Sequence, residues 1–205
     1  NKTAPIDDFK FSLSKMSKAG ALFDLVKLND ISKNYISTLD TETVYSGTIE
    51  WAKEYNEKLY KLLTENEAYA RAILGIERGN AKPRKDIGKW EDVENYLAYF
   101  YDELWDRKFD FADNLSKEDM AEIIEEYKKI YNPSASAEEW FPAVRDLSER
   151  LGYAKSPKDY KKDPDAFKGH VGDVSGVIRT AATGRRNTPD LYEILQTLGY
   201  DEVMK

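Results

Sequence analysis

The chain has 205 residues, a mass of 23.6 kDa and a formal net charge of −7. Its length suits one domain or two small ones, and an aromatic content of 13% argues against wholesale disorder. The absence of cysteine excludes disulfides, thiolate nucleophiles and cysteine-ligated metals, and a single histidine excludes a multi-histidine metal site. No apolar run approaches the roughly eighteen residues of a membrane span and the first residues contain no signal-peptide core, so we expect a cytoplasmic protein.

Helical spacing of apolar residues runs through most of the chain. From Val93 to Leu104 the apolar positions follow i, i+3, i+4, i+7, i+8, i+11, the stripe of an amphipathic helix that starts near Trp90. Similar stripes cover residues 69–76, 120–130, 140–151 and 171–181. Residues typical of helix starts and ends punctuate them, namely Ser116, Ser136 and Thr188-Pro189, then Gly152, Gly184 and Gly199. No convincing alternating strand is present, so we predict an all-α fold of about nine helices.

Positive charge is concentrated in two segments of this acidic protein. The breaker-rich joint from Glu77 to Lys89 holds five basic and two acidic residues. Residues 152–189 hold eight basic and four acidic residues, whereas residues 114–151 hold five basic and nine acidic ones. Such segments can mark a polyanion-binding surface, although charged runs are usually solvated faces.

The strongest local signal is a group of three arginines around a predicted helix start. Arg179 lies in the last turns of one predicted helix, and Arg185 and Arg186 precede the next, which is predicted to begin at Thr188-Pro189. Arginines near a helix N-terminus can bind phosphates and reach base edges with two hydrogen bonds, which lysine cannot do. The pattern therefore favours an RNA-binding surface.

Two other motifs carry less weight. Lys15-Met16-Ser17-Lys18-Ala19 resembles the Lys-Met-Ser-Lys-Ser loop of class I aminoacyl-tRNA synthetases, but that loop needs an upstream nucleotide-binding domain and only fourteen residues precede it here. His170 lies five residues before Ser175 without an orienting acid, so a helix cap is a simpler interpretation than a catalytic pair. We predict no catalytic and no metal-binding residue in this chain.

Three segments together resemble the C-terminal, anticodon-binding region of bacterial glutamyl-tRNA synthetases. The stretch 169–198 contains Ile-Arg-Thr-Ala-Ala-Thr-Gly followed by Thr-Pro-Asp-Leu-Tyr-Glu-Ile, and it is similar to the end of those enzymes. Residues 23–36 resemble a helix that follows the catalytic half of the family, and Lys82-Pro83-Arg84 resembles its Pro-Arg joint. The resemblance covers residues 12–205, and within it residues 15–24 match a segment later than the ATP-binding loop.

The resemblance implies the non-catalytic part of an ATP-dependent glutamate–tRNA ligase. Residues 1–108 would hold the end of the stem-contact region and a first helical anticodon-binding sub-domain, and residues 109–205 a second, with no nucleotide-binding α/β domain. We expect no cofactor in this chain, because ATP and Mg²⁺ serve the parent enzyme. We also expect a monomer whose partner is the glutamate tRNA, and neither DNA nor a membrane.

The resemblance also assigns anticodon-binding residues. Arg84 matches the arginine of the Pro-Arg joint, which contacts the third anticodon base and is associated with rejection of the glutamine tRNA. Arg179 and Leu191 match positions that meet the middle and third bases, and Thr188 and Pro189 accompany them. Further basic residues are candidates for contacts to the RNA backbone from their charge, namely Lys82, Lys85, Arg185 and Arg186.

Two alternatives stay open from the sequence. A helical protein-interaction module would present a large exposed apolar patch instead of an arginine-lined face. A stand-alone enzyme is disfavoured by the absent cysteine, the single histidine and the lack of a phosphate-binding glycine loop.

Overall fold

The computed structural model describes residues 6–8, 10–16 and 23–205. Within these ranges the chain folds into eleven α-helices and four 3₁₀ helices without a strand, which confirms the all-α prediction. One isolated bridge joins Ala154 and His170. The Lys-Met-Ser-Lys motif runs into residues 17–22, which lie outside the described residues.

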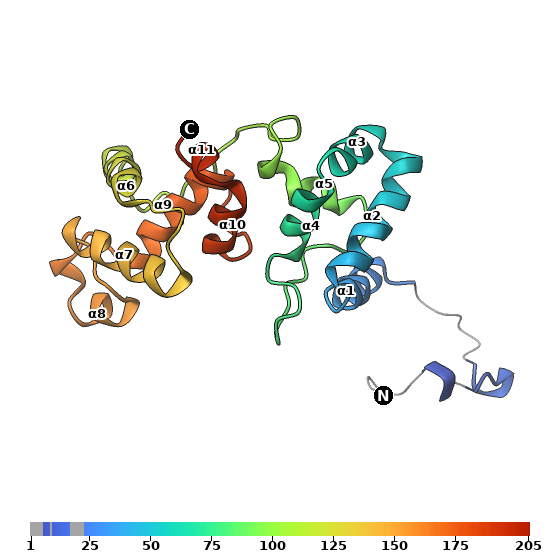
Figure 1. Ribbon diagram of the computed structural model, residues 1–205. Coiled ribbons are helices and arrows are strands. Elements are labelled where there is room, and N and C mark those ends of the chain that lie inside the picture. Colours follow the sequence, from blue (N-terminus) through green and yellow to red (C-terminus); the bar gives the residue numbers. More distant parts are fainter. Residues whose placement is uncertain (1–5, 9, 17–22) are drawn as a thin grey trace.

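The first five α-helices form one group, on the right of Figure 1. They are α1 (Leu25–Ile36), α2 (Thr41–Tyr55), α3 (Glu57–Glu65), α4 (Glu67–Gly75) and α5 (Asp92–Leu97). Two asparagines divide this run: Asn56 ends α2 and caps α3, and Asn66 ends α3 and caps α4. Each asparagine side chain accepts a hydrogen bond from the backbone N–H three residues ahead, which satisfies one free donor of the new helix. Such extra boundaries raise the number of helices above the nine predicted from apolar spacing.

The helix predicted from Trp90 to Leu104 is shorter than its apolar spacing indicated. Helix α5 ends at Leu97, a 3₁₀ helix (Ala98–Phe100) follows, and Tyr101 has the extended backbone angles φ −130° and ψ 119°. Most of the apolar stripe is nonetheless buried, including Val93, Leu97, Phe100 and Tyr101. The apolar spacing therefore predicted which side chains are buried, whereas the predicted length of the helix was wrong.

The remaining helices form a second group, on the left of Figure 1. They are α6 (Lys117–Ile130), α7 (Ala137–Arg150), α8 (Pro157–Lys162), α9 (Val171–Thr183), α10 (Leu191–Leu198) and α11 (Tyr200–Val203). The other 3₁₀ helices are Ile6–Asp8, Leu13–Lys15 and Pro164–Ala166. The predicted caps at Ser116 and Ser136 are confirmed, the second as a full capping box with Glu139. His170 caps α9 through a similar box with Asp173, and Gly184 ends α9 at φ +74°.

Each group has its own cluster of buried apolar side chains. The first cluster runs from Ile36 to Tyr101, and the second begins at Ile123. Helix α10 belongs to both, because Ile194 packs into the first cluster whereas Leu191 and Leu195 pack into the second. The predicted boundary between residues 108 and 109 falls between the two clusters along the chain, and the division into two sub-domains stays a prediction.

The segment that joins the groups also packs on the end of α9. The backbone N–H of Asp110 donates to the carbonyl of Gly184 at 2.9 Å. A Cβ atom on Gly184 would lie 2.3 Å from the carbonyl oxygen of Lys108, well inside van der Waals contact. Both the left-handed backbone and this close approach therefore require glycine at the C-terminus of α9.

Candidate nucleic-acid interface

The turn between α9 and α10 differs from its prediction. Thr188 and Pro189 do not start α10, which begins at Leu191 with Asp190 as its N-cap. The Asp190 carboxylate accepts from the backbone N–H of Glu193 at 3.0 Å. The reason for the shift is that the carbonyls and hydroxyl of the Thr-Pro pair are engaged by Arg179, which leaves Asp190 to cap the helix.

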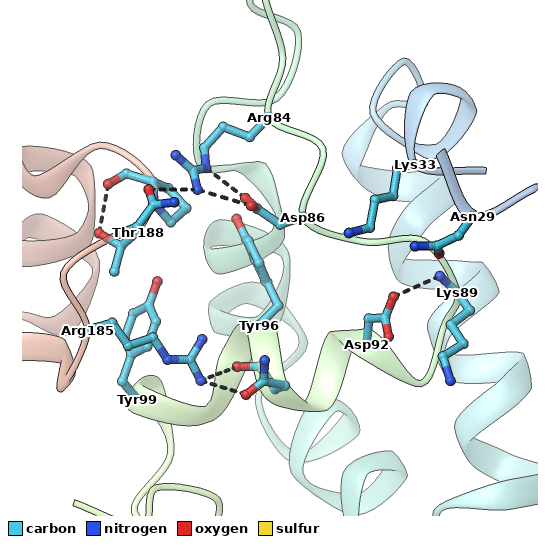
Figure 2. Close-up of a pocket in the computed structure, with 13 residues that line it drawn as sticks. Asn29, Lys33, Arg84, Asp86, Lys89, Asp92, Tyr96, Tyr99, Arg185 and Thr188 are labelled. Carbon is cyan, nitrogen blue, oxygen red and sulfur yellow. Dashed lines mark hydrogen bonds and ion pairs between the residues drawn. The ribbon is translucent and has the colours of Figure 1, made fainter. Parts of the chain in front are cut away.

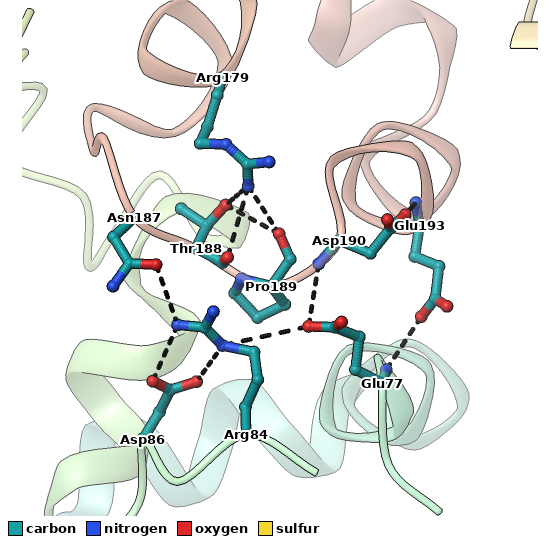
Figure 3. A network of polar contacts seen from close by, with 9 residues as sticks. All are labelled: Glu77, Arg84, Asp86, Arg179, Asn187, Thr188, Pro189, Asp190 and Glu193. Atoms are coloured by element: carbon teal, nitrogen blue, oxygen red, sulfur yellow. Dashed lines mark hydrogen bonds and ion pairs between the residues drawn. The ribbon is translucent and has the colours of Figure 1, made fainter. Parts of the chain in front are cut away.

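Arg179 lies under this turn and holds it in place. Its Nη1 atom donates to the Pro189 carbonyl at 2.7 Å and also to the carbonyl and the hydroxyl of Thr188 (Figure 3). Burial lowers the pKa of Arg179, since the surrounding protein solvates the charge less well than water does. Charge-assisted hydrogen bonds to the backbone compensate for that cost, so Arg179 positions the residues that follow α9.

Arg84 comes from the joint between α4 and α5 and faces the same turn. Its Nε and Nη2 atoms donate to the Asp86 carboxylate at 2.7 and 3.0 Å, and Nη2 also reaches the amide oxygen of Asn187 at 3.3 Å (Figure 3). The Arg84 side chain is 30% exposed, and no described residue accepts a hydrogen bond from its Nη1 atom. Arg84 therefore keeps two N–H donors for a further acceptor.

Two glutamates tie the joint to the start of α10, and they were not predicted. Glu193 accepts from the backbone N–H of Glu77 at 3.0 Å, and Glu77 accepts from the backbone N–H of Asp190 at 3.2 Å (Figure 3). Glu77 has φ +56°, an uncommon conformation for a residue other than glycine. Glu193 lies in the Thr-Pro-Asp-Leu-Tyr-Glu motif, which could have drawn attention to it. No motif in the sequence singled out Glu77.

A pocket of about 480 Å³ opens beside Arg84, between the two groups of helices. Figure 2 shows Asn29 and Lys33 of α1 on one side of it and Arg185 and Thr188 on the other. The lining includes four cationic and two anionic side chains, namely Lys33, Arg84, Lys89, Arg185, Asp86 and Asp92. Its polar lining and excess of positive charge suit an anionic ligand that also carries hydrogen-bonding groups.

Two tyrosines of the α5 region and Arg185 form another wall of the pocket. Arg185 donates through Nη2 to the carbonyl and the side-chain oxygen of Asn95 at 2.7 and 2.8 Å, and its guanidinium lies 5.4 Å from the ring centroid of Tyr99. Burial raises the pKa of Tyr96 to about 12, so its phenol stays protonated at neutral pH. The neutral phenol of Tyr96 and the planar cation of Arg185 both suit contact with a nucleobase.

The other predicted residues lie away from this pocket or beneath its surface. Lys82 and Lys85 are exposed on the joint. Arg186 faces a different way and forms a two-pronged ion pair with Asp110, at 2.9 and 2.6 Å. Leu191 is only 3% exposed and packs in the second apolar cluster, so its side chain does not reach the surface. Its contact with an anticodon base stays a prediction.

The pocket contains residues that sequence reasoning did not select, chiefly Lys33, Lys89, Asn95, Tyr96 and Tyr99. Charge marked Lys89 only as one of several basic residues in the joint, Tyr96 was interpreted as part of an apolar helix stripe, and Tyr99 was not singled out. In the described part of the chain, no cluster of three or more His, Asp or Glu side chains is placed to hold a metal ion. Of the helices described, none is long and apolar enough to cross a membrane.

The fold and the site together define an all-helical protein with an arginine-bearing pocket where two helical groups meet. The chain is 44% identical over 207 residues to a glutamate–tRNA ligase of Clostridium perfringens (strain 13 / Type A), and the match covers 99% of this chain and 38% of the relative. It is 42% identical to the glutamate–tRNA ligase of Acetivibrio thermocellus, covering 99% of this chain and 37% of the relative. It is 38% identical to that of Sorangium cellulosum, covering 99% and 36%. No protein-family model matches the chain.

The chain is thus a homologue of the glutamate–tRNA ligases, which confirms the resemblance seen in its motifs. It spans between 36% and 38% of the length of these three relatives, as a fragment of such a ligase would. The activity of the whole ligase and its partners are therefore matters for proposal.

Proposed function

We propose that this chain is the RNA-binding part of an ATP-dependent glutamate–tRNA ligase and that it recognises the anticodon of the glutamate tRNA. Its relatives are named for joining glutamate to tRNA, and this chain matches little more than a third of their length. The catalytic chemistry, with ATP and Mg²⁺, is assigned to the remainder of the ligase. This chain would supply selection of the tRNA.

The observation that carries the proposal is the pocket around Arg84. The protein has a net charge of −7, yet four cations and two carboxylates line this pocket. A site for the phosphates and splayed bases of an RNA loop needs this local reversal of charge. The pocket is also large enough for a nucleotide rather than for a lone ion.

Arg84 is the residue best placed to read a base. Its pairing with Asp86 fixes the plane of the guanidinium, and Nη1 then presents its donors to an acceptor on a base edge. A base that lacked the acceptor would leave these donors unpaired on binding, which costs about 1–3 kcal/mol. Arg179 would act on the same bases through Thr188 and Pro189, whose positions it fixes.

The test measures binding of the chain to glutamate tRNA and to a tRNA that differs only in the third anticodon base, each at two salt concentrations. Wild type should prefer the correct anticodon, and binding should weaken as salt rises because phosphate contacts release counterions. Arg84→Gln should reduce that preference by about 1–3 kcal/mol in binding free energy, while its salt dependence changes little.

Arg150→Gln serves as the matched control, because Arg150 is exposed on α7 in the second group of helices, outside the residues that line the pocket. It should preserve the preference for the correct anticodon. Unchanged preference in Arg84→Gln would contradict the assigned role of Arg84, and equal binding of both tRNAs by wild type would contradict anticodon recognition by this chain.

A further inference from the structure

A second pocket, of about 380 Å³, opens in the second group of helices and is lined mainly by apolar side chains. Helices α6, α9 and α10 contribute to one side of it, and the segment that joins the two groups of helices contributes to the other. Its apolar lining includes Trp105, Phe109, Phe111, Ile124, Ile178 and Leu195. A concave and mostly apolar space of this size is typical of sites that bind small organic molecules.

Three aromatic side chains of the joining segment, Trp105, Phe109 and Phe111, form an aromatic wall of this apolar pocket. The ring centroid of Phe109 lies 5.7 Å from that of Trp105 and 6.1 Å from that of Phe111. The hydrogen bond from Asp110 to the carbonyl of Gly184 anchors the wall to the end of α9. Phe109 is nonetheless 45% exposed, so part of a large apolar ring remains available to a ligand.

Backbone strain and small side chains keep the pocket open. Arg107 adopts φ +51°, an uncommon conformation for a residue with a Cβ atom, and its guanidinium lies 5.1 Å from the ring centroid of Trp105. On the side of α9, Ala181 and Ala182 line the pocket with side chains that end at Cβ. The space is therefore a preformed feature between a held segment and two short side chains.

Cations outnumber anions among the charged side chains that line the apolar pocket. They are Arg107, Lys128 and Lys205, with Glu202 as the one carboxylate. Arg107 forms an ion pair with Asp102 at 2.5 Å, and Lys205 pairs with Glu202. Lys128 of α6 forms no ion pair with a described residue, so its ammonium group can pair with an anion from outside the chain.

We propose that the apolar pocket binds a small aromatic anion of the aryl carboxylate class, with its ring against the aromatic wall and its carboxylate at Lys128. Burial of the ring supplies binding free energy, and the ammonium group selects for negative charge. The volume suits a molecule of one or two rings, whereas a partner helix about 10–12 Å across would not fit. The lining shares no residue with the pocket around Arg84, so the proposal does not depend on RNA binding.

The test titrates the chain with 1-naphthoate and with 1-naphthalenemethanol, its neutral counterpart, and follows the methyl signals of Ile124 and Ile178 by NMR. Both residues line the pocket, so their signals should shift saturably with naphthoate. The alcohol should bind about fivefold more weakly, because it cannot form an ion pair with Lys128. Lys128→Glu should weaken binding of naphthoate by about tenfold and leave binding of the alcohol unchanged. Ala182→Leu should weaken binding of both compounds, because it adds atoms inside the pocket.

Lys129→Glu is the matched control, since Lys129 is the next residue of α6, pairs with Glu126 and does not line the pocket. It should preserve binding of naphthoate. The absence of saturable shifts, or equal shifts of Ile73 in the first apolar cluster, would overturn the proposal. Equal binding of acid and alcohol, or equal losses in the two lysine variants, would overturn the assigned chemistry of the ligand. Dimerisation of the chain that excludes naphthoate as protein concentration rises would overturn it and assign the pocket to a second copy.

Discussion

The joint of residues 77–89 and the turn of residues 184–190 meet at the same pocket but hold arginines in different ways. Arg84, in the joint, is paired with the carboxylate of Asp86 and keeps part of its guanidinium exposed. Arg179 lies under the turn and donates to the backbone carbonyls of Thr188 and Pro189. A surface ion pair can exchange partners at little cost, whereas a carbonyl left without its donor in a half-buried place cannot. An arginine beside a pocket therefore either contacts the ligand or holds the backbone around it, and its hydrogen-bond partners decide which role it has.

Gly184→Ala should lower the free energy of unfolding most, because it disturbs the backbone of the turn. The added Cβ would meet the Lys108 carbonyl at 2.3 Å and would occupy a left-handed conformation, so we expect a loss of about 3 kcal/mol in the free energy of unfolding. Gly176→Ala is the control on the same helix, where nothing lies within 4 Å of the new Cβ. It should stabilise the protein by about 0.5–1 kcal/mol. Urea denaturation measures both variants, and equal effects would refute the geometry.

Arg179→Ala and Arg84→Gln should differ in their effect on the free energy of unfolding, because Arg179 holds the turn in place whereas Arg84 faces the pocket. Arg179→Ala leaves the carbonyls of Thr188 and Pro189 without their donor and should lower the free energy of unfolding by about 2 kcal/mol. Arg84→Gln breaks an ion pair whose partners are both partly exposed, so its effect should stay within about 0.5 kcal/mol. Thermal unfolding followed by circular dichroism reports the difference. A larger loss in Arg84→Gln would reverse the roles assigned to the two arginines.

A double-mutant cycle on Glu77 and Glu193 tests whether the joint and the turn act as one unit. Each carboxylate accepts a backbone N–H from the other's segment, so the two contacts support the same alignment. Glu77→Ala and Glu193→Ala should couple by about 1 kcal/mol in the free energy of unfolding. A second cycle that combines Glu193→Ala with Glu50→Ala provides the control, because Glu50 is an exposed residue of α2, and these two changes should be additive. Strict additivity of the first pair would show that the contacts act independently.

The smallest effect concerns the pH dependence of the ion pair between Arg186 and Asp110. The arginine lowers the pKa of Asp110 below its ordinary value of 3.8. A carboxylate whose pKa is lowered by folding stabilises the folded protein at pH values above its ordinary pKa. This contribution is lost as the pH falls through the lowered pKa. Titration of the Asp110 carboxyl followed by NMR should therefore move to higher pH in Arg186→Gln, and an unchanged midpoint would contradict the pair.

Sequence patterns predicted the ends of helices better than the site. Ser116, Ser136 and Gly184 act as predicted, because capping depends on hydrogen bonds and backbone angles within a few residues. The Thr188-Pro189 prediction was wrong for a tertiary reason, since Arg179, nine residues earlier in the chain, engages that pair. Glu77 carried no local signal, because its partner, Glu193, lies 116 residues further along the chain.

The helical class, most caps, the arginine-rich segments and the relationship to glutamate–tRNA ligases could all be predicted from the sequence. All of these depend on residue type and short spacing, which a linear chain displays directly. Tertiary packing, in contrast, brings Arg84 and Arg185 into one pocket with Lys33 and Tyr96, and it buries Leu191. The pocket combines residues of the first group with the turn of residues 184–190, so its composition depends on how the two apolar clusters meet around α10, a packing outcome that no local pattern encodes.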